Sequence, residues 1–286
     1  MITVFTPSYN RRKELEQLYK SLIKQKNCDF EWLIVDDGSS DDTKEYISEL
    51  KKQNKVKINY IHKKNGGKQS AYNRGLKEAK GDIFLCIDSD DILMNNVLKI
   101  IESDFKKIND DENICGIAYA QSYISDKDKV IGCLFPKDNL VDTYFNICHK
   151  HKVTGDKLIV LKTDVAREYY FPLIEGEKFI PEALVFNRIS LKYKLKCSNK
   201  IMACKEYLEN GYSNNYFNLV KRNPKGNMLY FKEIYSHDKK IYNIYGYILF
   251  GIYSKTSINT ILKEHPAKIK VILLYIPTWI VAKIRR

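Results

Sequence analysis

The chain has 286 residues, 44% of them hydrophobic, which is enough to bury a full core and argues against a disordered protein. Its seven cysteines are odd in number, widely spaced and free of any C-x-x-C pair, so they indicate neither a disulfide framework nor a zinc site and favour a reducing cytosol. The formal net charge of +13 is compatible with nucleic acid, anionic lipid or a phosphorylated ligand as partner, or with a lysine-rich genome alone.

Strand and helix signals alternate over about the first 100 residues, with short connections between them. In chain order we expect a strand at 2–6, a helix around 15–23, a strand at 32–35, a helix at 41–52, a strand at 58–61, a helix at 69–79 and a strand at 83–87. This alternation predicts an α/β fold with a Rossmann-like, mostly parallel sheet flanked by helices. Ligands of such sheets bind beyond the carboxyl ends of the strands, so the segments that follow these four strands should converge on one crevice.

The second part of the chain has a different pattern. We expect strands at 116–123 and 157–161 around a helix near 139–148, then a helix at 177–191 and a strand at 201–207. Beyond 212 the sequence is rich in tyrosine and helix-like, and it ends in a helix over 267–286. The sequence therefore predicts a main α/β domain over 1–211 and a helical C-terminal extension over 212–286.

A pair of carboxylates closes the apolar strand at 83–87. Asp88 and Asp90 stand two residues apart, with Ser89 between them. Hard oxygen ligands of this kind hold Mg²⁺ or Mn²⁺, and such an ion keeps its other positions for water and substrate phosphates. A bound ion would neutralise a leaving diphosphate. The alternative is a solvated acidic turn that binds nothing.

A glycine turn, Asn65-Gly66-Gly67-Lys68, leads directly into the expected helix at 69–79. Its backbone can approach a phosphate closely, and the helix N-terminus would face that phosphate. Lys68 and Arg74 are therefore candidates for diphosphate contacts, with a plain turn as the alternative. The sequence matches neither the G-x-x-x-x-G-K-[ST] phosphate loop nor the G-x-G-x-x-G dinucleotide fingerprint, which argues against an ATPase or a dehydrogenase.

Two further carboxylates, Asp36 and Asp37, end the strand at 32–35. A carboxylate at this position can accept the imide N–H of uracil or a ribose hydroxyl. Tyr9, just after the first strand, is placed to stack on the base. For Asp36 a structural role is also open, because Asp-Gly-Ser forms a good turn before a helix cap.

Four ordered motifs resemble those of family 2 glycosyltransferases, which are inverting enzymes with a GT-A-type fold: TPSYNR at 6–11, IVDDGSSDDT at 34–43, NGGKQSAYNRGLKEAKGD at 65–82 and DSDD at 88–91. The resemblance implies that the domain at 1–211 is catalytic and that Asp90 and Asp88 hold Mn²⁺ or Mg²⁺. It implies a nucleotide-sugar donor, UDP rather than GDP or dTDP, bound by Thr6, Pro7, Tyr9, Arg11, Asp36, Asp37, Lys68, Arg74, Asp88 and Ser89.

The resemblance also implies a catalytic carboxylate at the start of a later helix, usually as Glu-Asp followed six residues on by Arg. Here Glu182 lies six residues before Arg188, with Pro181 where the family usually has Glu. Glu182 is therefore the expected base that deprotonates the acceptor hydroxyl. Glu175 and Glu177 compete for this role, and a helix-capping carboxylate is the structural alternative for Glu182.

Donor-sugar or acceptor contacts are expected, by position in the chain and in the family pattern, at Asp156, Lys157, Glu177, Tyr207 and Ser213. The last two belong to an expected flap at 207–213. No Gln-x-x-Arg-Trp motif of processive synthases follows the base, so transfer of one sugar per acceptor is expected.

The C-terminal stretch 267–286 has an apolar centre, five basic residues and no acidic one. Its apolar run, 271–282, contains Pro277 and is shorter than the roughly 20 residues needed to span a bilayer. We expect it to dock on an anionic membrane, which would make the protein cytoplasmic and peripheral to the membrane. Packing on the domain or in a homodimer is the alternative. Docking would suit a lipid-linked saccharide acceptor in the synthesis of a bacterial surface polysaccharide, such as capsule, O-antigen or cell-wall glycan.

Two other classes of protein explain less of the sequence. A sugar-nucleotide pyrophosphorylase, or a related nucleotidyltransferase-like protein, would show a glycine-rich loop near its N-terminus, whereas residues 6–10 read Thr-Pro-Ser-Tyr-Asn. A non-catalytic module, binding either sugar nucleotides or nucleic acid, has no need for the carboxylates Asp37, Asp88, Asp90 and Glu182. No nucleic-acid recognition motif is evident, so nucleic acid is not expected as a partner.

Overall fold

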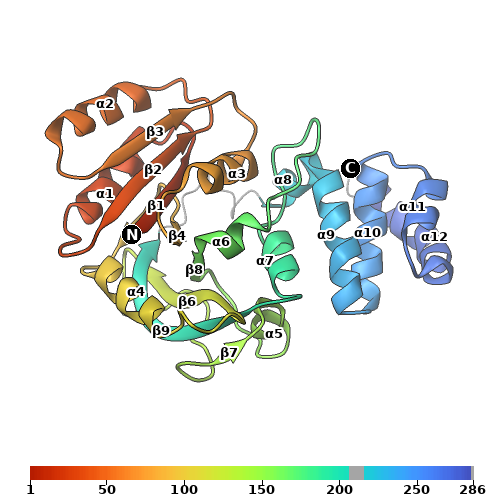
Figure 1. Ribbon diagram of the computed structural model, residues 1–286. Helices are drawn as coiled ribbons and strands as arrows, with labels where there is room; N and C mark the ends of the chain where they lie inside the picture. Colours follow the sequence, from red (N-terminus) through yellow and green to blue (C-terminus); the bar gives the residue numbers. More distant parts are fainter. Residues whose placement is uncertain (206–215, 285–286) are drawn as a thin grey trace. The chain divides into compact units, whose positions relative to one another are not determined.

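A computed structural model describes residues 1–205 and 216–284, and the chain divides into two compact units (Figure 1). The first unit consists of Met1–Tyr170 and Arg188–Glu206, and the second of Phe171–Asn187 and Tyr207–Arg286. The stretch 171–187 thus groups with the second unit, although it lies inside the range 1–211 expected for the main domain.

The first unit is built on one sheet, which among the described residues has nine strands in the order β3-β2-β1-β4-β8-β6-β9-β5, with β7 paired to β9. β1 is parallel to β2 and β4, and β2 is parallel to β3, so the carboxyl ends of these four strands lie at one edge. Beyond β4 the sheet is mixed. The bounds are β1 (Ile2–Ser8), β2 (Phe30–Asp36), β3 (Ile58–His62), β4 (Ile83–Cys86), β5 (Asp91–Leu93), β6 (Ile114–Tyr123), β7 (Val141–Asp142), β8 (Leu158–Lys162) and β9 (Lys194–Lys205).

Helices of the first unit pack on this sheet through apolar faces with helical spacing. In α1 the buried Leu15, Leu18 and Leu22 recur every three or four residues and join a core that includes Trp32. α3 approaches β1 closely, because a Cβ atom on Gly75 would lie only 2.3 Å from the Phe5 ring. The helices are α1 (Arg12–Leu22), α2 (Thr43–Gln53), α3 (Lys68–Glu78), α4 (Val97–Lys106), α5 (Tyr144–His149) and α6 (Thr163–Arg167).

The predicted α/β class is confirmed, and the order of the first seven elements is the order found. Three later predictions were wrong in extent. The helix expected near 139–148 begins only at α5, because β7 occupies its first part, and the strand expected at 201–207 begins at Lys194. The helix expected at 177–191 is limited to α7 (Ala183–Ile189), because Gly176 has a positive φ and Pro181 precedes the helix. α4 and the three-residue β5 were missed.

Residues 216–284, the described C-terminal part of the second unit, are largely helical, as the sequence predicts. α10 is apolar on every side and is buried between α9 and α12, which is the environment that such a helix requires. Among the described residues, no helix combines the length and the apolar character needed to cross a bilayer. The helices are α8 (Tyr216–Arg222), α9 (Pro224–His237), α10 (Ile241–Tyr253), α11 (Ile258–Glu264) and α12 (Lys268–Ile284).

Candidate active site

Hydrogen bonds join the segments that follow β1, β2 and β3. The backbone N–H of Asn10 donates to the Ser39 hydroxyl at 2.8 Å, which connects the first segment to the second. The Asp37 carboxylate accepts the backbone N–H groups of Gly66 at 2.9 Å and Gly67 at 2.7 Å, which connects the second segment to the third. Because β1, β2 and β3 are parallel neighbours, the turns at their carboxyl ends lie together although they are far apart in the sequence.

The third segment contacts the fourth through an ion pair. Lys68, the first residue of α3, places its Nζ atom 2.6 Å from Oδ1 of Asp88, which follows β4. Gly67, at the N-cap position, has φ +88°, a conformation that favours glycine. The four segments named from the sequence thus share one edge of the sheet, and the N-terminus of α3 lies beside the acidic strand end.

Asp37 orders the glycine turn from within the protein. Its side chain is almost fully buried, its two oxygens accept the Gly66 and Gly67 N–H groups, and Lys63 forms an ion pair with it. A carboxylate with this many donors is fixed in position. The predicted nucleoside contact of Asp37 stays a prediction, and the contacts seen show that it holds the loop that would receive phosphate.

Asp36, Thr6 and Pro7 have buried side chains. Asp36 accepts hydrogen bonds from the Tyr60 hydroxyl and, at 2.8 Å, from the backbone N–H of Ser39. Burial and the hydrogen bond to Asp36 raise the pKa of Tyr60, so the Tyr60 hydroxyl stays a neutral donor. Thr6 accepts the indole N–H of Trp32 at 3.0 Å. These contacts favour a structural role for Asp36 and Thr6, the alternative that the sequence left open for Asp36.

Tyr9 and Arg74 are the exposed members of the predicted donor set. Tyr9 is 51% exposed just beyond β1, where its ring is open to a stacking partner. Arg11 is half-buried and pairs with Glu14 at 3.1 Å. Arg74 lies six residues along α3 from Lys68 and pairs with Glu78 at 2.9 Å, so its described contact is on the exposed surface of the helix.

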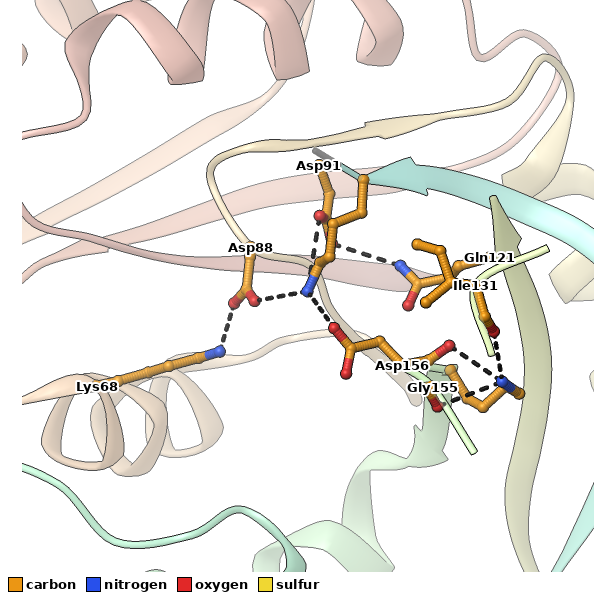
Figure 2. A network of polar contacts seen from close by, with 9 residues as sticks. Lys68, Asp88, Asp91, Gln121, Ile131, Gly155 and Asp156 are labelled. Atoms are coloured by element: carbon orange, nitrogen blue, oxygen red, sulfur yellow. Dashed lines mark hydrogen bonds and ion pairs between the residues drawn. The ribbon is translucent and has the colours of Figure 1, made fainter. Parts of the chain in front are cut away.

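A lysine that the sequence analysis missed connects three carboxylates of the site. The Nζ atom of Lys205, at the end of β9, lies 3.5 Å from Asp88, 3.9 Å from Asp91 and 3.2 Å from Asp156 (Figure 2). Burial alone would lower the pKa of Lys205, but the three carboxylates raise it well above its usual value. Burial likewise acts to raise the pKa of Asp88, but Lys68 and Lys205 hold it below its usual range. Lys205 and Asp88 therefore stay charged, whereas burial raises the pKa of Asp91 well above its usual value.

Lys157 orders the loops beside this cluster. Its ammonium donates to the backbone carbonyl of Thr154 at 2.7 Å. It also donates to the carbonyls of Ile131 at 3.1 Å and Gly155 at 3.2 Å (Figure 2). Burial lowers its pKa. These contacts hold in place the turn that carries Asp156, whereas the predicted contact of Lys157 with donor sugar or acceptor stays untested.

The acidic strand end, Asp88 to Asp90, offers carboxylate oxygens of the kind that bind a hard cation, but it offers few of them. Among the residues that the structure describes, no three His, Cys, Asp or Glu side chains are grouped to hold a metal ion. Both oxygens of Asp88 face lysines, and Asp90 is half-buried with a pKa raised by burial and by Asp88. Mg²⁺ characteristically binds through one or two carboxylates together with substrate phosphates. Asp90 and Asp88 fit that arrangement, and Ser89 between them is buried.

Removal of the Lys205 charge should destabilise the first unit. In Lys205→Met the buried Asp91 and its neighbour Asp88 would lose the cation they share, at a cost of about 3 kcal/mol in the free energy of unfolding. Urea unfolding followed by circular dichroism measures the change. Lys205→Arg, which keeps the charge, should retain most of the stability. A Met variant as stable as the wild type would contradict this role.

In the second unit, two glutamates that the sequence proposed as alternatives have different surroundings. Glu177 accepts the backbone N–H of Lys225 at 2.6 Å on one oxygen and that of Gly226 at 2.7 Å on the other, so it caps the N-terminus of α9. Glu182 immediately precedes α7 and has an exposed side chain. Tyr207, Ser213 and the expected flap at 207–213 lie outside the described residues.

The first unit has the construction of a GT-A-type fold, in which parallel strands end at a glycine turn, a helix N-terminus and an acidic strand end. The chain belongs to glycosyl transferase family 2, because residues 3–169, more than half of its length, match the model of that family. The resemblance of the four N-terminal motifs is thereby confirmed.

Relatives match about a third of the chain. An uncharacterized glycosyltransferase of Rickettsia conorii is 40% identical over 99 residues, which are 35% of this chain and 16% of the relative. The poly(ribitol-phosphate) beta-N-acetylglucosaminyltransferase TarS of Staphylococcus aureus is 33% identical over 99 residues, 34% of this chain and 17% of TarS. The matched part is therefore less than a fifth of either relative.

Solved structures share the fold over nearly the whole chain. The crystal structure of residues 1–349 of S. aureus TarS in complex with UDP-GlcNAc has a TM-score of 0.65 at 18% identity, and the match covers 98% of this chain and 88% of that one. A mannosyltransferase from Pyrobaculum calidifontis in complex with GDP-Man and Mn²⁺ has a TM-score of 0.55 at 14% identity, over 99% of this chain and 83% of that one. At such identities the likeness concerns the fold.

Proposed function

We propose that the protein is an inverting glycosyltransferase that moves one sugar from a nucleotide-diphosphate sugar to a saccharide acceptor. The observation that carries this function is the contact of Lys68, the first residue of α3, with Asp88 at the acidic strand end, in which the Lys68 Nζ atom lies 2.6 Å from Oδ1 of Asp88. The N-terminus of α3 and the Lys68 ammonium would bind a diphosphate, and the acidic strand end would bind the metal ion that accompanies it. Family membership and the fold shared with the UDP-GlcNAc complex of TarS support the same conclusion and favour a UDP-sugar.

The donor site is proposed to consist of contacting and supporting residues. Tyr9 would stack on the base with Arg11 beside it, and Lys68 with the N–H groups at the start of α3 would bind the diphosphate. Thr6 and Asp36 have their side chains engaged inside the unit and would keep the turns in register.

Asp90, with Asp88, would hold Mn²⁺ or Mg²⁺, which supplies charge neutralisation for the leaving diphosphate when bound. The mannosyltransferase that shares the fold was solved with Mn²⁺. The lysines around Asp88 keep that carboxylate ionised, and Lys205 links it to Asp91 across the strand end.

Glu182 is the proposed catalytic base. It would take the proton from the acceptor hydroxyl as that oxygen bonds to the anomeric carbon and the bond from this carbon to the diphosphate oxygen breaks. Attack opposite the leaving group inverts the configuration and releases the nucleoside diphosphate. Its exposed carboxylate contrasts with that of Glu177, both of whose oxygens cap α9.

The acceptor is proposed to be a saccharide of a bacterial surface polysaccharide, presented on a lipid carrier to a cytoplasmic protein at the inner face of the membrane. TarS is a poly(ribitol-phosphate) beta-N-acetylglucosaminyltransferase, which supports a cell-wall or related surface glycan. Capsule and O-antigen are the other glycans of this class.

A hydrolysis screen tests the proposed function. The purified protein is incubated with UDP-, GDP- and dTDP-sugars in the presence of Mn²⁺, and release of the nucleoside diphosphate is measured. We expect release from one or a few UDP-sugars, and none after chelation of the metal. Failure to consume any nucleotide sugar would contradict the function. Formation of a nucleoside triphosphate from sugar nucleotide and pyrophosphate would instead identify a nucleotidyltransferase.

A further inference from the structure

The last helix of the second unit, α12, has two opposite faces. On one face Val271, Thr278 and Ala282 are fully buried, and α12 packs there against α10 (Figure 1). The Thr278 hydroxyl donates to the backbone carbonyl of Leu274 at 2.7 Å, so this polar group is satisfied within the helix. The helix is therefore held along its length by its own unit.

The opposite face of α12 is apolar and exposed. Ile269 is 76% exposed, Leu273 70% and Ile276 68%. Residues three and four apart share one side of a helix, and the exposed apolar positions continue at this spacing with Ile272, Ile280 and Ile284. Single exposed apolar side chains are common, but a stripe of this length on one helix marks an interaction surface.

Basic residues flank this stripe. Lys268 and Lys270 are exposed at the start of α12 and Lys283 at its end, and the sequence continues with Arg285 and Arg286. The chain contains no acidic residue from 267 to its end, and its formal net charge is +13. Trp279 lies at the edge of the stripe, with the Lys283 ammonium 5.2 Å from its ring centroid. An apolar stripe flanked by basic side chains is complementary to a surface whose outer layer is negatively charged and whose interior is apolar.

We propose that the apolar face of α12 docks on an anionic lipid bilayer, with the helix lying in the interface and the flanking lysines at the phosphate level. Interfacial helices have this combination of apolar side chains, Lys and Trp. A second copy of the chain would bring equal positive charges together, whereas anionic lipid neutralises them. Membrane docking deepens the proposed function. Its biological purpose rests on the lipid-linked acceptor proposed there.

Sedimentation with lipid vesicles tests the docking. The full chain should bind vesicles in which about a third of the phosphatidylcholine is replaced by phosphatidylglycerol, and should bind pure phosphatidylcholine much less. Leu273→Asp should lower the partition coefficient about tenfold or more, because it puts a charge into the apolar contact. Lys268→Gln and Lys270→Gln should each lower it about fivefold on the anionic vesicles, with an effect that shrinks at high salt.

Leu191→Asp is the matched control. Leu191 is 72% exposed in the first unit, close to the 70% of Leu273, so the same substitution adds the same charge at another surface. It should leave vesicle binding unchanged. Equal loss in both variants, or no binding by the wild type, would overturn the docking. So would a wild-type dimer, seen by light scattering, that Leu273→Asp converts into monomers without any vesicle binding.

Sugar-nucleotide hydrolysis in solution separates this inference from the proposed function. If Leu273→Asp retains hydrolysis and loses vesicle binding, the docking is supported. If the wild type hydrolyses a sugar nucleotide but ignores vesicles, the docking fails and the function stands. If it binds vesicles through α12 but consumes no sugar nucleotide, the function fails and the docking stands.

Discussion

Asp90→Asn should reduce turnover of the sugar nucleotide by about 100-fold or more, because a metal that neutralises a leaving diphosphate contributes several kcal/mol to the transition state. Asp90 is the carboxylate for which no lysine contact within ion-pair distance is seen among the described residues, whereas Asp88 has two. Asn has the same size but no charge, so the loss isolates the charge that would hold the cation. Initial rates of nucleoside diphosphate release over a range of Mn²⁺ concentrations measure it.

The same substitution should leave stability equal or higher at neutral pH. Burial, and then Asp88, raise the pKa of Asp90. For an acid whose pKa is higher in the folded state, the unfolded state releases its proton first as the pH rises, so the ionised group costs stability above the folded-state pKa. Asn removes that cost. Asp82→Asn, at a largely exposed carboxylate, is the control and should keep its turnover. Full turnover of Asp90→Asn at low Mn²⁺ would exclude Asp90 as a ligand.

Glu182→Gln should lower transfer to the acceptor about 1,000-fold, within the range of general-base contributions, while binding of the donor is retained. Gln keeps the shape and the hydrogen-bonding capacity of Glu but cannot accept the hydroxyl proton. If Glu182 only capped a helix, the variant would lose about 1 kcal/mol of stability and little activity. Single-turnover kinetics with a saturating donor, together with calorimetric titration of the donor, distinguish these outcomes.

The neighbouring glutamates provide the comparison. Glu177→Gln should lower the unfolding free energy by about 1 kcal/mol, because an amide accepts only one of the two N–H donors that the carboxylate now satisfies at α9. A Glu182→Gln variant with full transfer would contradict the assignment. In that case loss of transfer in Glu175→Gln, without loss of stability, would move the role of base to Glu175.

The sequence predicts the site best where the interactions that form it are local. Strand-like runs such as 2–6 and 32–35, with helical spacing between them, identify βα units, and the turns after them are short enough to be located within a residue or two. Parallel pairing then places their carboxyl ends at one edge, so the neighbourhood of Lys68 and Asp88 followed from the alternation alone.

The roles of individual side chains could not be obtained in the same way. Lys205 and Asp91 face each other because β5 pairs with β9 in antiparallel register, and no local pattern specifies which residue of a strand distant in the sequence stands opposite. For the same reason the sequence did not show that Asp36 would be bonded to Tyr60, on the strand beside it, or that Glu177 would cap a helix beginning 47 residues later.

By itself, the amino-acid sequence determined the α/β class, the family and the four turns that make the site, because each depends on residues close together in the chain. Only the tertiary structure decided which carboxylates of those turns are engaged in holding the fold and which remain accessible. That choice is made by partners from distant segments, whose contact depends on strand register and helix packing and not on local composition.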